Sequence, residues 1–487
     1  MLSWPEVNIK IIIRVIGFLL MFEGVFMFLG IPIALYYSGD RCDPLIISGI
    51  ICILSGLALS ILTKNAKGKH IGKREGVIIV TTSWIIISLF GTLPFILSGT
   101  ITNFTDAFFE TVSGFTTTGA TILTDIEAVP KGILFWRSIT HWIGGMGIIV
   151  LSVAILPILG IGGMQLFVAE IPGPTLDKLH PRITHTAKRL WGIYILLTFV
   201  ETAFLMFGGM DLFDGLCHAF GTMATGGFST QNTSIAGYSP YIQYVITVFM
   251  ILAGTNFTLH YIALHGNISK VWKNDEYRAY IYLIAAVTII IAVSLILKRN
   301  MSFEESFRES IFQTVSIITT TGYITADYLI WPGLLWLILF LMMFVGGCAG
   351  STGGGIKVMR QLLLFKNSWI ELKRLLHPNA IIPVKMNGKG VSQDIIFKVM
   401  AFFLIYIIIF AFGTMFMSLF GLDFETSIGA TIATLGNIGP GLGDVGPVGN
   451  YAAIPAPGKW FLSFLMIIGR LELFTVLVLL SPAFWKR

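Results

Sequence analysis

Four short stretches rich in threonine and glycine could place backbone oxygens around a cation. Thr is a poor helix former and Gly a worse one, so each stretch interrupts the apolar sequence around it. When several such turns meet on one axis, their oxygens can replace the hydration shell of a monovalent cation. The candidate binding residues are Thr116, Thr117, Thr118, Gly119, Ala224, Thr225, Gly226, Gly227, Thr319, Thr320, Thr321, Gly322, Gly436, Asn437, Ile438 and Gly439. The predicted chemistry is therefore ion coordination.

The four stretches occur at one spacing. Each follows a semi-apolar segment that is too short to cross a membrane. A glycine lies 13 positions after the first residue of each segment, which gives the pairs Asp106 and Gly119, Asp214 and Gly227, Glu309 and Gly322, and Thr426 and Gly439. The count selects Gly227 over Gly226, and in the fourth stretch Gly436 stays the alternative to Gly439. Repetition on this scale predicts four copies of one structural unit.

The elements that must position these stretches are apolar. The chain has 487 residues, of which 55% are hydrophobic and 12% charged, whereas a soluble protein is about 25% charged. Many runs approach the ~20 residues that a helix needs to cross the hydrocarbon core. The ten predicted spans are Ile16–Leu35, Ile46–Leu62, Val77–Leu97, Ile133–Leu159, Trp191–Phe207, Tyr241–Leu264, Tyr280–Leu297, Leu334–Leu364, Ile395–Leu419 and Trp460–Leu480.

These patterns predict an all-α polytopic membrane protein. Four pseudo-symmetric membrane–pore-loop–membrane repeats would surround one pore, because non-helical backbone at membrane depth must line a cavity or be buried in protein. Residues 1–70 would form two extra transmembrane helices, followed by repeats at 71–185, 186–272, 273–390 and 391–487. Glycine permits dihedral angles that aim carbonyls inward, and the short helices would point their partly negative C-terminal ends at the axis.

Basic residues predict the orientation. If the N-terminus is inside, the inner segments hold 21 Lys and Arg residues and the outer segments hold six, as the positive-inside rule expects. Both termini are therefore predicted to be cytoplasmic, and the net charge of +6 belongs to the inner loops, which disfavours a nucleic-acid partner. Glu110 and Asp214 are expected near the outer mouth, where they could concentrate cations.

Two features inside the spans could obstruct a pore. The glycine-rich stretch of the eighth span is either a flexible kink or a loop lying beneath the filter; its residues include Gly346, Gly347, Gly350, Ser351, Thr352, Gly353, Gly354 and Gly355. Arg470 is near the middle of the tenth span, where a lone arginine costs ~2.5–3.5 kcal/mol on insertion scales. It is either a structural ion-pair partner, for example of Glu472, or a fixed positive charge in the pore.

The motifs together resemble the Trk/Ktr/HKT superfamily of potassium transporters. The resemblance is carried by SGFTTTGAT, ATGGFST, TTTGY, GNIGPGLG, HWIGGMGI, GGCAGSTGGGIK and GRLELFTVLVLLSPAFW. The extra helix pair is similar to the TrkH/TrkG-like bacterial branch, and Gly119 matches the potassium-selective pattern of the first repeat. The fourth repeat departs from the others because it lacks Thr-Thr-Thr.

The resemblance implies a function and partners. It implies a K+ filter gated by the glycine-rich loop and Arg470, in a homodimer of the bacterial inner membrane that pairs with a TrkA-like cytosolic nucleotide-binding ring. No cofactor is implied, and K+ is the transported ion. A secondary transporter with broken helices usually shows two inverted repeats rather than four in one orientation, and a membrane enzyme would need a nucleophile or metal motif that the sequence lacks. Passive and ion- or ATP-coupled movement both stay open.

Overall fold

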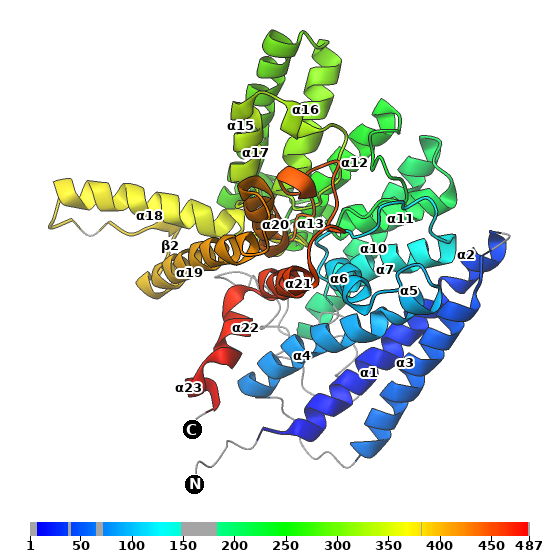
Figure 1. Ribbon diagram of the computed structural model, residues 1–487. Coiled ribbons are helices and arrows are strands. Elements are labelled where there is room, and N and C mark those ends of the chain that lie inside the picture. The colour runs from blue at the N-terminus through cyan, green and yellow to red at the C-terminus, as the bar shows by residue number, and fades with distance from the viewer. Residues whose placement is uncertain (1–6, 38–39, 65–71, 148–182, 381, 486–487) are drawn as a thin grey trace.

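The computed structural model describes residues 7–37, 40–64, 72–147, 183–380 and 382–485, and these are almost entirely helical (Figure 1). The helices are α1 (Ile9–Phe28), α2 (Ile31–Tyr36), α3 (Asp43–Leu62), α4 (Lys73–Gly91), α5 (Leu93–Leu97), α6 (Phe104–Phe115), α7 (Lys131–Gly145), α10 (Ile183–Phe207), α11 (Leu212–Met223), α12 (Pro240–Ala253), α13 (Phe257–Leu264), α14 (Ile268–Trp272), α15 (Asp275–Arg299), α16 (Phe303–Ile318), α17 (Gly333–Met342), α18 (Val358–Leu376), α19 (Gln393–Ser418), α20 (Phe424–Gly436), α21 (Ala456–Arg470), α22 (Leu473–Leu480) and α23 (Pro482–Trp485). Short 3-10 turns at Tyr328–Ile330 and Gly443–Val445 and a small hairpin of β1 (Lys385–Met386) and β2 (Lys389–Gly390) complete the secondary structure.

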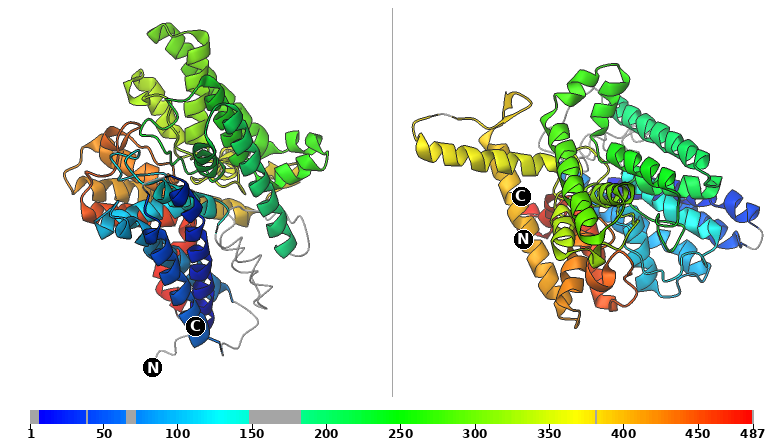
Figure 2. Two further views of the ribbon diagram at one scale, coloured as in Figure 1. Left: turned by 90° about the vertical axis from the view of Figure 1, so that its right-hand side faces the viewer. Right: turned by 90° about the horizontal axis from the view of Figure 1, so that it is seen from above.

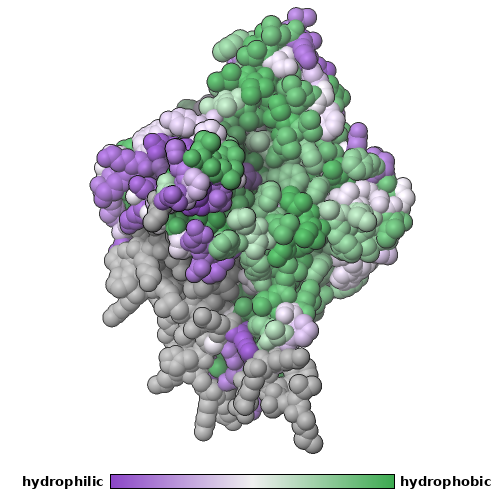
Figure 3. All heavy atoms as spheres, turned by 90° about the vertical axis from the view of Figure 1, so that its left-hand side faces the viewer, coloured by the Kyte–Doolittle hydropathy of each residue, from purple (hydrophilic) through white to green (hydrophobic). Residues whose placement is uncertain are grey.

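Long apolar helices confirm the predicted membrane protein. Six helices in the described part of the chain are long and apolar enough to cross a membrane, and two bent helix pairs bring the number to eight. Large side chains on these helices, such as Phe199, Tyr282 and Leu404, are exposed. Figure 3 shows a broad apolar surface of this kind, with polar residues at its edges. Such a surface fits contact with lipid, since soluble proteins rarely expose a large apolar patch.

Three predicted spans differ from the structure. The sixth and tenth are broken, with bends of 100° between α12 and α13 and 118° between α21 and α22. The eighth is not one helix, because α17 ends at Met342 and α18 begins at Val358 and projects from the bundle (Figure 1). The sequence predicted one continuous span in each case, because the apolar sequence continues through each break. The fourth span is described only as α7, and its second half lies outside the described residues.

Four short helices, α6, α11, α16 and α20, begin in the same way. Each has a side-chain N-cap that accepts a hydrogen bond from a backbone N–H of the first turn, which satisfies a donor that the helix itself cannot pair. The caps are Asn103, Asp211, Ser302 and Asp423. Each helix then leads directly into one of the four threonine- or glycine-rich turns, so the helix fixes where the turn lies.

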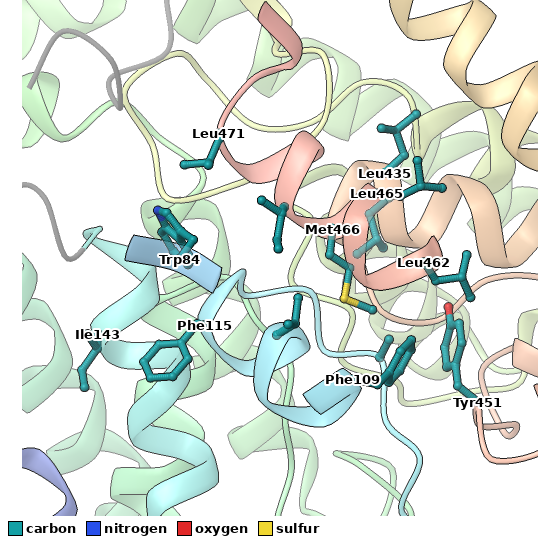
Figure 4. Close-up of a cluster of buried hydrophobic side chains, with 14 of the residues drawn as sticks. Trp84, Phe109, Phe115, Ile143, Leu435, Tyr451, Leu462, Leu465, Met466 and Leu471 are labelled. Atoms are coloured by element: carbon teal, nitrogen blue, oxygen red, sulfur yellow. The ribbon is translucent and has the colours of Figure 1, made fainter. Parts of the chain in front are cut away.

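The N-terminal helices pack through glycine. In the contact between α1 and α3, a methyl group added at Gly17 would lie 2.7 Å from the Gly56 carbonyl oxygen, and one at Gly24 would lie 2.6 Å from the Gly49 carbonyl oxygen. Small residues let helix backbones approach this closely in membranes. Helix α4 connects this pair to α6, which packs in turn against α21. Phe109 of α6, Met466 and Leu462 of α21, and Tyr451 gather at that contact (Figure 4).

Candidate functional site: a ring of four turns

The four turns adopt one backbone conformation. The glycine selected by the sequence count has a positive φ in every turn, and so does the residue two places before it. The φ values are 53° and 80° at Thr117 and Gly119, 53° and 78° at Thr225 and Gly227, 61° and 79° at Thr320 and Gly322, and 54° and 93° at Asn437 and Gly439. Positive φ is uncommon for non-glycine residues, and Asn adopts it more readily than Thr. The four turns are therefore geometric equivalents, with Asn437 in place of a threonine.

The turns contact one another in a closed cycle. A methyl group at each glycine would meet the carbonyl oxygen of the residue that precedes the glycine of the next turn. Gly119 faces Gly226 O, Gly227 faces Thr321 O, Gly322 faces Ile438 O, and Gly439 faces Thr118 O at 2.8 Å from the added methyl. The order first–second–third–fourth–first closes a ring. Only glycine fits these positions, because the neighbouring backbone occupies the space of a side chain.

The ring distinguishes the glycines that the sequence could not. Gly439 is equivalent in contact and dihedral angles to the other three ring glycines, whereas Gly436 is the last residue of α20. Gly226 contributes the carbonyl oxygen that Gly119 faces, so it corresponds to the residue before the ring glycine. All sixteen candidate residues, four from each turn, belong to or border this ring.

Threonine hydroxyls in the turns are buried and bond mostly within their own turn. Thr116 Oγ1 lies 2.8 Å from Thr118 Oγ1, and Thr319 Oγ1 lies 2.7 Å from Thr321 Oγ1. Two of the positive-φ threonines also reach the glycine-rich stretch: Thr225 Oγ1 lies 2.6 Å from the Ala224 carbonyl oxygen and 3.3 Å from Thr352 Oγ1, and Thr320 Oγ1 accepts the Gly354 N–H bond at 2.7 Å. These intra-turn bonds brace the backbone, so that its carbonyl groups can keep a fixed orientation.

A buried ion pair lies behind the first and second turns. Glu110 of α6 accepts a hydrogen bond from Arg137 Nε of α7 at 2.7 Å, and both side chains are at most 2% exposed. Arg137 also donates to the Ser229 carbonyl oxygen at 3.1 Å, and its guanidinium lies 3.5 Å from the centre of the Phe228 ring. Glu110 is therefore not a free acid at the outer mouth, and that expectation was wrong. The chain folds it inward because Arg137 and the Ile122 N–H group satisfy its charge.

Other acids of the outer loops are also anchored. Asp214 accepts hydrogen bonds from Thr230 at 2.6 Å and Tyr238 at 3.2 Å. The Asn232 amide donates to Asp125 at 3.0 Å and holds the pKa of that exposed carboxyl below its ordinary value. The bond between Asn232 and Asp125 joins the second outer loop to the first, whereas the bonds of Asp214 stay within the second.

Tyrosines link the turns, and the sequence reasoning missed them. Tyr323, directly after the third ring glycine, donates to the His218 carbonyl oxygen of α11 at 3.0 Å. Tyr328 donates to the Gly441 carbonyl oxygen at 2.8 Å, and Tyr451 donates to the Gly439 carbonyl oxygen at 2.8 Å. A tyrosine immediately after TTTG was the available signal, because a buried hydroxyl requires a hydrogen-bond partner.

The glycine-rich stretch forms a loop beneath the ring. At its base, Lys357 N–H donates to the Val345 carbonyl oxygen at 2.8 Å, which closes the loop. At its tip, Gly354 N–H donates to Thr320 Oγ1 at 2.7 Å, and a methyl at Gly353 would lie 2.8 Å from the Thr319 carbonyl oxygen. The remaining loop residues pack within the loop or against the segment that follows α12. Gly346 contacts Gly355, and Ser351 donates to the Cys348 carbonyl oxygen. Gly347 contacts Gly254, and Gly350 contacts Asn256. The kink alternative is therefore wrong, since the stretch is a folded loop against the turns.

Arg470 joins this loop to α7. Its guanidinium donates to the Thr352 carbonyl oxygen at 2.6 Å, to the Gly145 carbonyl oxygen at 2.8 Å, and also to the Gly144 carbonyl oxygen. Glu472 forms an ion pair at 2.5 Å with Arg360, at the start of α18. Arg470 thus lies at the break between α21 and α22, where it holds the carbonyl groups at the tip of the loop and at the end of α7.

This architecture defines a class, a polytopic helical membrane protein with a ring of backbone carbonyls at its centre. The model of the TrkH family, described as a cation transport protein, matches residues 44–487. The chain is 42% identical to the Trk system potassium uptake protein TrkH of Escherichia coli (strain K12) over 487 residues, covering 98% of this chain and 100% of that protein. It is 36% identical to the TrkG protein of the same organism, covering 98% and 99%.

A solved structure agrees. The crystal structure of the potassium transporter TrkH from Vibrio parahaemolyticus matches with a TM-score of 0.88 and 38% sequence identity, covering 98% of this chain and 100% of that chain. The chain belongs to the TrkH family of cation transport proteins. It is a transporter and not an enzyme.

Proposed function

We propose that this chain is a potassium uptake protein, which passes K+ across the bacterial inner membrane through the ring of four turns. The observation that carries the proposal is the closed cycle in which each ring glycine faces a carbonyl oxygen of the next turn. Convergent carbonyl oxygens can take the place of water around an alkali cation. The names of the relatives TrkH and TrkG, both Trk system potassium uptake proteins, support K+ as the ion.

We infer that four pore repeats build this filter. Residues 71–185, 186–272, 273–390 and 391–487 would each supply one short helix and one turn, and residues 1–70 would add the outer helix pair. The common N-caps and the equal dihedral angles of the turns support this division. K+ would bind at the sixteen filter residues, with backbone carbonyl oxygens as its main ligands.

The glycine loop and Arg470 form the proposed gate. The loop tip contacts the second and third turns through Thr352 and Gly354, and Arg470 holds the Thr352 carbonyl oxygen. A loop in this position blocks the inner side of the ring, and a fixed positive charge beside it repels cations. Ions would pass when the loop moves away from the turns.

Cytosolic and membrane partners complete the proposal. The chain would form homodimers in the lipid bilayer and pair with a TrkA-like nucleotide-binding ring that controls the gate. The basic segment 366–389, with exposed Lys373, Lys385 and Lys389, supports an inner docking surface. We expect the chain to copurify with such a ring. We expect this copurification to be lost when these lysines are replaced by glutamate.

Flux from proteoliposomes tests the function directly. Purified protein is reconstituted with K+, Na+ or Rb+ inside and no other gradient, and release of each ion is measured against liposomes without protein. K+-selective release supports the pore, and strict dependence on a second ion would replace it with a carrier.

Deletion of residues 346–355 tests the gate. The two ends of the loop already lie together at the bond between Lys357 and Val345, so a short Gly-Ser linker can close the chain. The deletion is expected to raise cation flux in the same liposomes, and unchanged flux with intact protein refutes the gate.

A further inference from the structure

Glu276 lies outside the ring and the loop but contacts the first limb of the loop and the start of α18. It is in the first turn of α15 and only 2% exposed. Its Oε1 atom accepts a hydrogen bond from the Ala349 N–H group at 2.6 Å, on the first limb, and from the Met359 N–H group at 3.1 Å, in the first turn of α18. One carboxylate oxygen therefore ties the start of the loop to the helix that follows it.

Both bonds satisfy donors that their own segments cannot pair. Met359 N–H belongs to the first turn of α18, where the helix offers no backbone acceptor, and a negative charge there also interacts favourably with the helix dipole. Ala349 is next to Cys348, whose N–H donates to the Gly254 carbonyl oxygen at 2.8 Å. Hydrogen bonds to an ionised acceptor are stronger than neutral ones, so Glu276 fixes the loop more firmly than a neutral contact could.

The neighbouring Asp275 extends this connection to the inner surface. Its carboxylate pairs with Lys366 of α18 at 2.9 Å and accepts the Asn387 N–H bond at 3.0 Å, in the turn of the β1–β2 hairpin. The first turn of α15 thus contacts the loop, α18 and the hairpin together. When α18 moves relative to α15, either the bonds of Glu276 to the loop and α18 break, or the loop moves together with the helices.

We propose that Glu276 is a positioning residue of the gate, which holds the glycine loop beneath the ring and couples it to α18. The inference rests on the proposed function, in which the loop obstructs the pore. Glu276 acts through the backbone of Ala349 and Met359. Release of this clamp frees the loop without altering the ring.

Flux and thiol labelling test the clamp in the full-length reconstituted protein. Glu276→Ala removes both bonds and is expected to raise K+ flux about tenfold, which corresponds to the loss of roughly one hydrogen bond to a charged group. Glu276→Gln keeps a carbonyl oxygen at the same reach but loses the charge, so it is expected to raise flux less than Glu276→Ala does. Glu371→Ala on α18 is the matched control, because Glu371 pairs with Arg374 of the same helix and, among the described residues, has no bond to the loop.

Cys348 provides a second readout beside Ala349. It is buried, whereas Cys42 is partly exposed and serves as an internal reference. Maleimide is expected to label Cys348 faster in Glu276→Ala than in Glu276→Gln, with the site assigned by peptide mass. If Glu276→Ala fails to purify as a single species, Glu276→Asp, which keeps the charge but shortens the reach, is expected to give a smaller rise in both measurements.

The outcomes separate the clamp from the gate. If the loop deletion raises flux but folded Glu276→Ala matches the unmodified chain in flux and labelling, the clamp is wrong and the proposed function stands. If neither variant changes flux but Cys348 labelling rises in Glu276→Ala, the clamp holds the loop and the loop is not the gate. Lower flux in Glu276→Ala with unchanged labelling also overturns the clamp.

Discussion

The residue two places before each ring glycine has a left-handed backbone conformation, which costs a β-branched residue of the order of 1–3 kcal/mol. Thr117, Thr225 and Thr320 accept this conformation because the ring around them is tightly packed. Asn437 replaces threonine in the fourth turn, and its amide donates to Thr118 Oγ1 at 2.9 Å and to the Met466 carbonyl oxygen at 3.0 Å. One side chain therefore joins the first turn, the fourth turn and α21.

Alanine at two neighbouring glycines should have different effects. Gly439→Ala adds a methyl 2.8 Å from the Thr118 carbonyl oxygen at a φ of 93°, so it must displace the ring. Gly436→Ala adds one 3.0 Å from the flexible Ile438 Cδ1 atom within a helix. We expect K+ flux to fall more than about tenfold for Gly439→Ala, which corresponds to more than ~1.4 kcal/mol, and to fall less for Gly436→Ala. Equal loss in both would contradict the distinct role of Gly439 as the ring glycine of the fourth turn.

Removal of Glu110 should destabilise the protein. Glu110→Ala leaves the Arg137 guanidinium buried without its carboxylate, and breaking a buried pair in this way costs ~3–5 kcal/mol. We expect a clearly lower unfolding temperature for purified protein in detergent. Glu304→Ala, which removes a partly exposed pair with Arg308 at 2.8 Å, should change stability by less than about 0.5 kcal/mol. Similar losses for both variants would contradict a special role of the buried pair.

Sequence spacing could predict the ring glycines but not the side chains that hold them. The interval of 13 residues located Gly119, Gly227, Gly322 and Gly439 because each of these glycines closely follows the last residue of its short helix. The partner of Glu110 could not be predicted, since Arg137 follows 27 positions later in another helix. Contacts between copies, such as that of Tyr323 with His218, depend on packing that no local pattern encodes.

At the scale of elements, the breaks in helices have local causes. Helix α13 has a side-chain N-cap, with Asn256 Oδ1 accepting the Thr258 N–H bond at 2.8 Å, and this cap starts a new direction after α12. Between α21 and α22, Glu472 has a φ of 58°, which a continuous helix cannot contain. Neither the Asn256 cap nor the φ of Glu472 affects hydropathy. The sequence therefore predicted the apolar segments but treated each bent helix pair as one straight span.

Replacement of Arg470 tests its proposed role in the gate, where it connects the glycine-rich loop to α7. Arg470→Ala removes the positive charge and the bonds that hold Thr352 of the loop and Gly145 of α7. We expect higher single-channel conductance or higher flux, because both the barrier charge and the loop anchor are lost. Arg470→Lys keeps the charge but not the planar fork of donors, and should give an intermediate value. If transport collapses and the protein no longer elutes as one species, Arg470 has a structural role instead.

At the scale of the whole molecule, the two described ends of the chain lie on the same side. Figure 1 and Figure 2 show the first turns of α1 and the helix α23 at the same end of the molecule. The basic excess of the inner segments predicts that this side is cytoplasmic. The loop between α2 and α3, which contains Cys42, and the outer loop with Asp125 would then face the opposite side, and α18 would face the cytoplasm.

Labelling from each side of the membrane tests that orientation. Cys42 is partly exposed, and the three other cysteines are buried within the part of the chain that the structure describes. We expect a membrane-impermeant maleimide to label Cys42 in spheroplasts, whose outer face is open. In a Cys42→Ser background, a cysteine placed at exposed Lys373 of α18 should react only in inside-out vesicles. Labelling of the Lys373→Cys variant in intact spheroplasts would show that α18 faces the outside. It would contradict the predicted orientation and the cytoplasmic position of the gate.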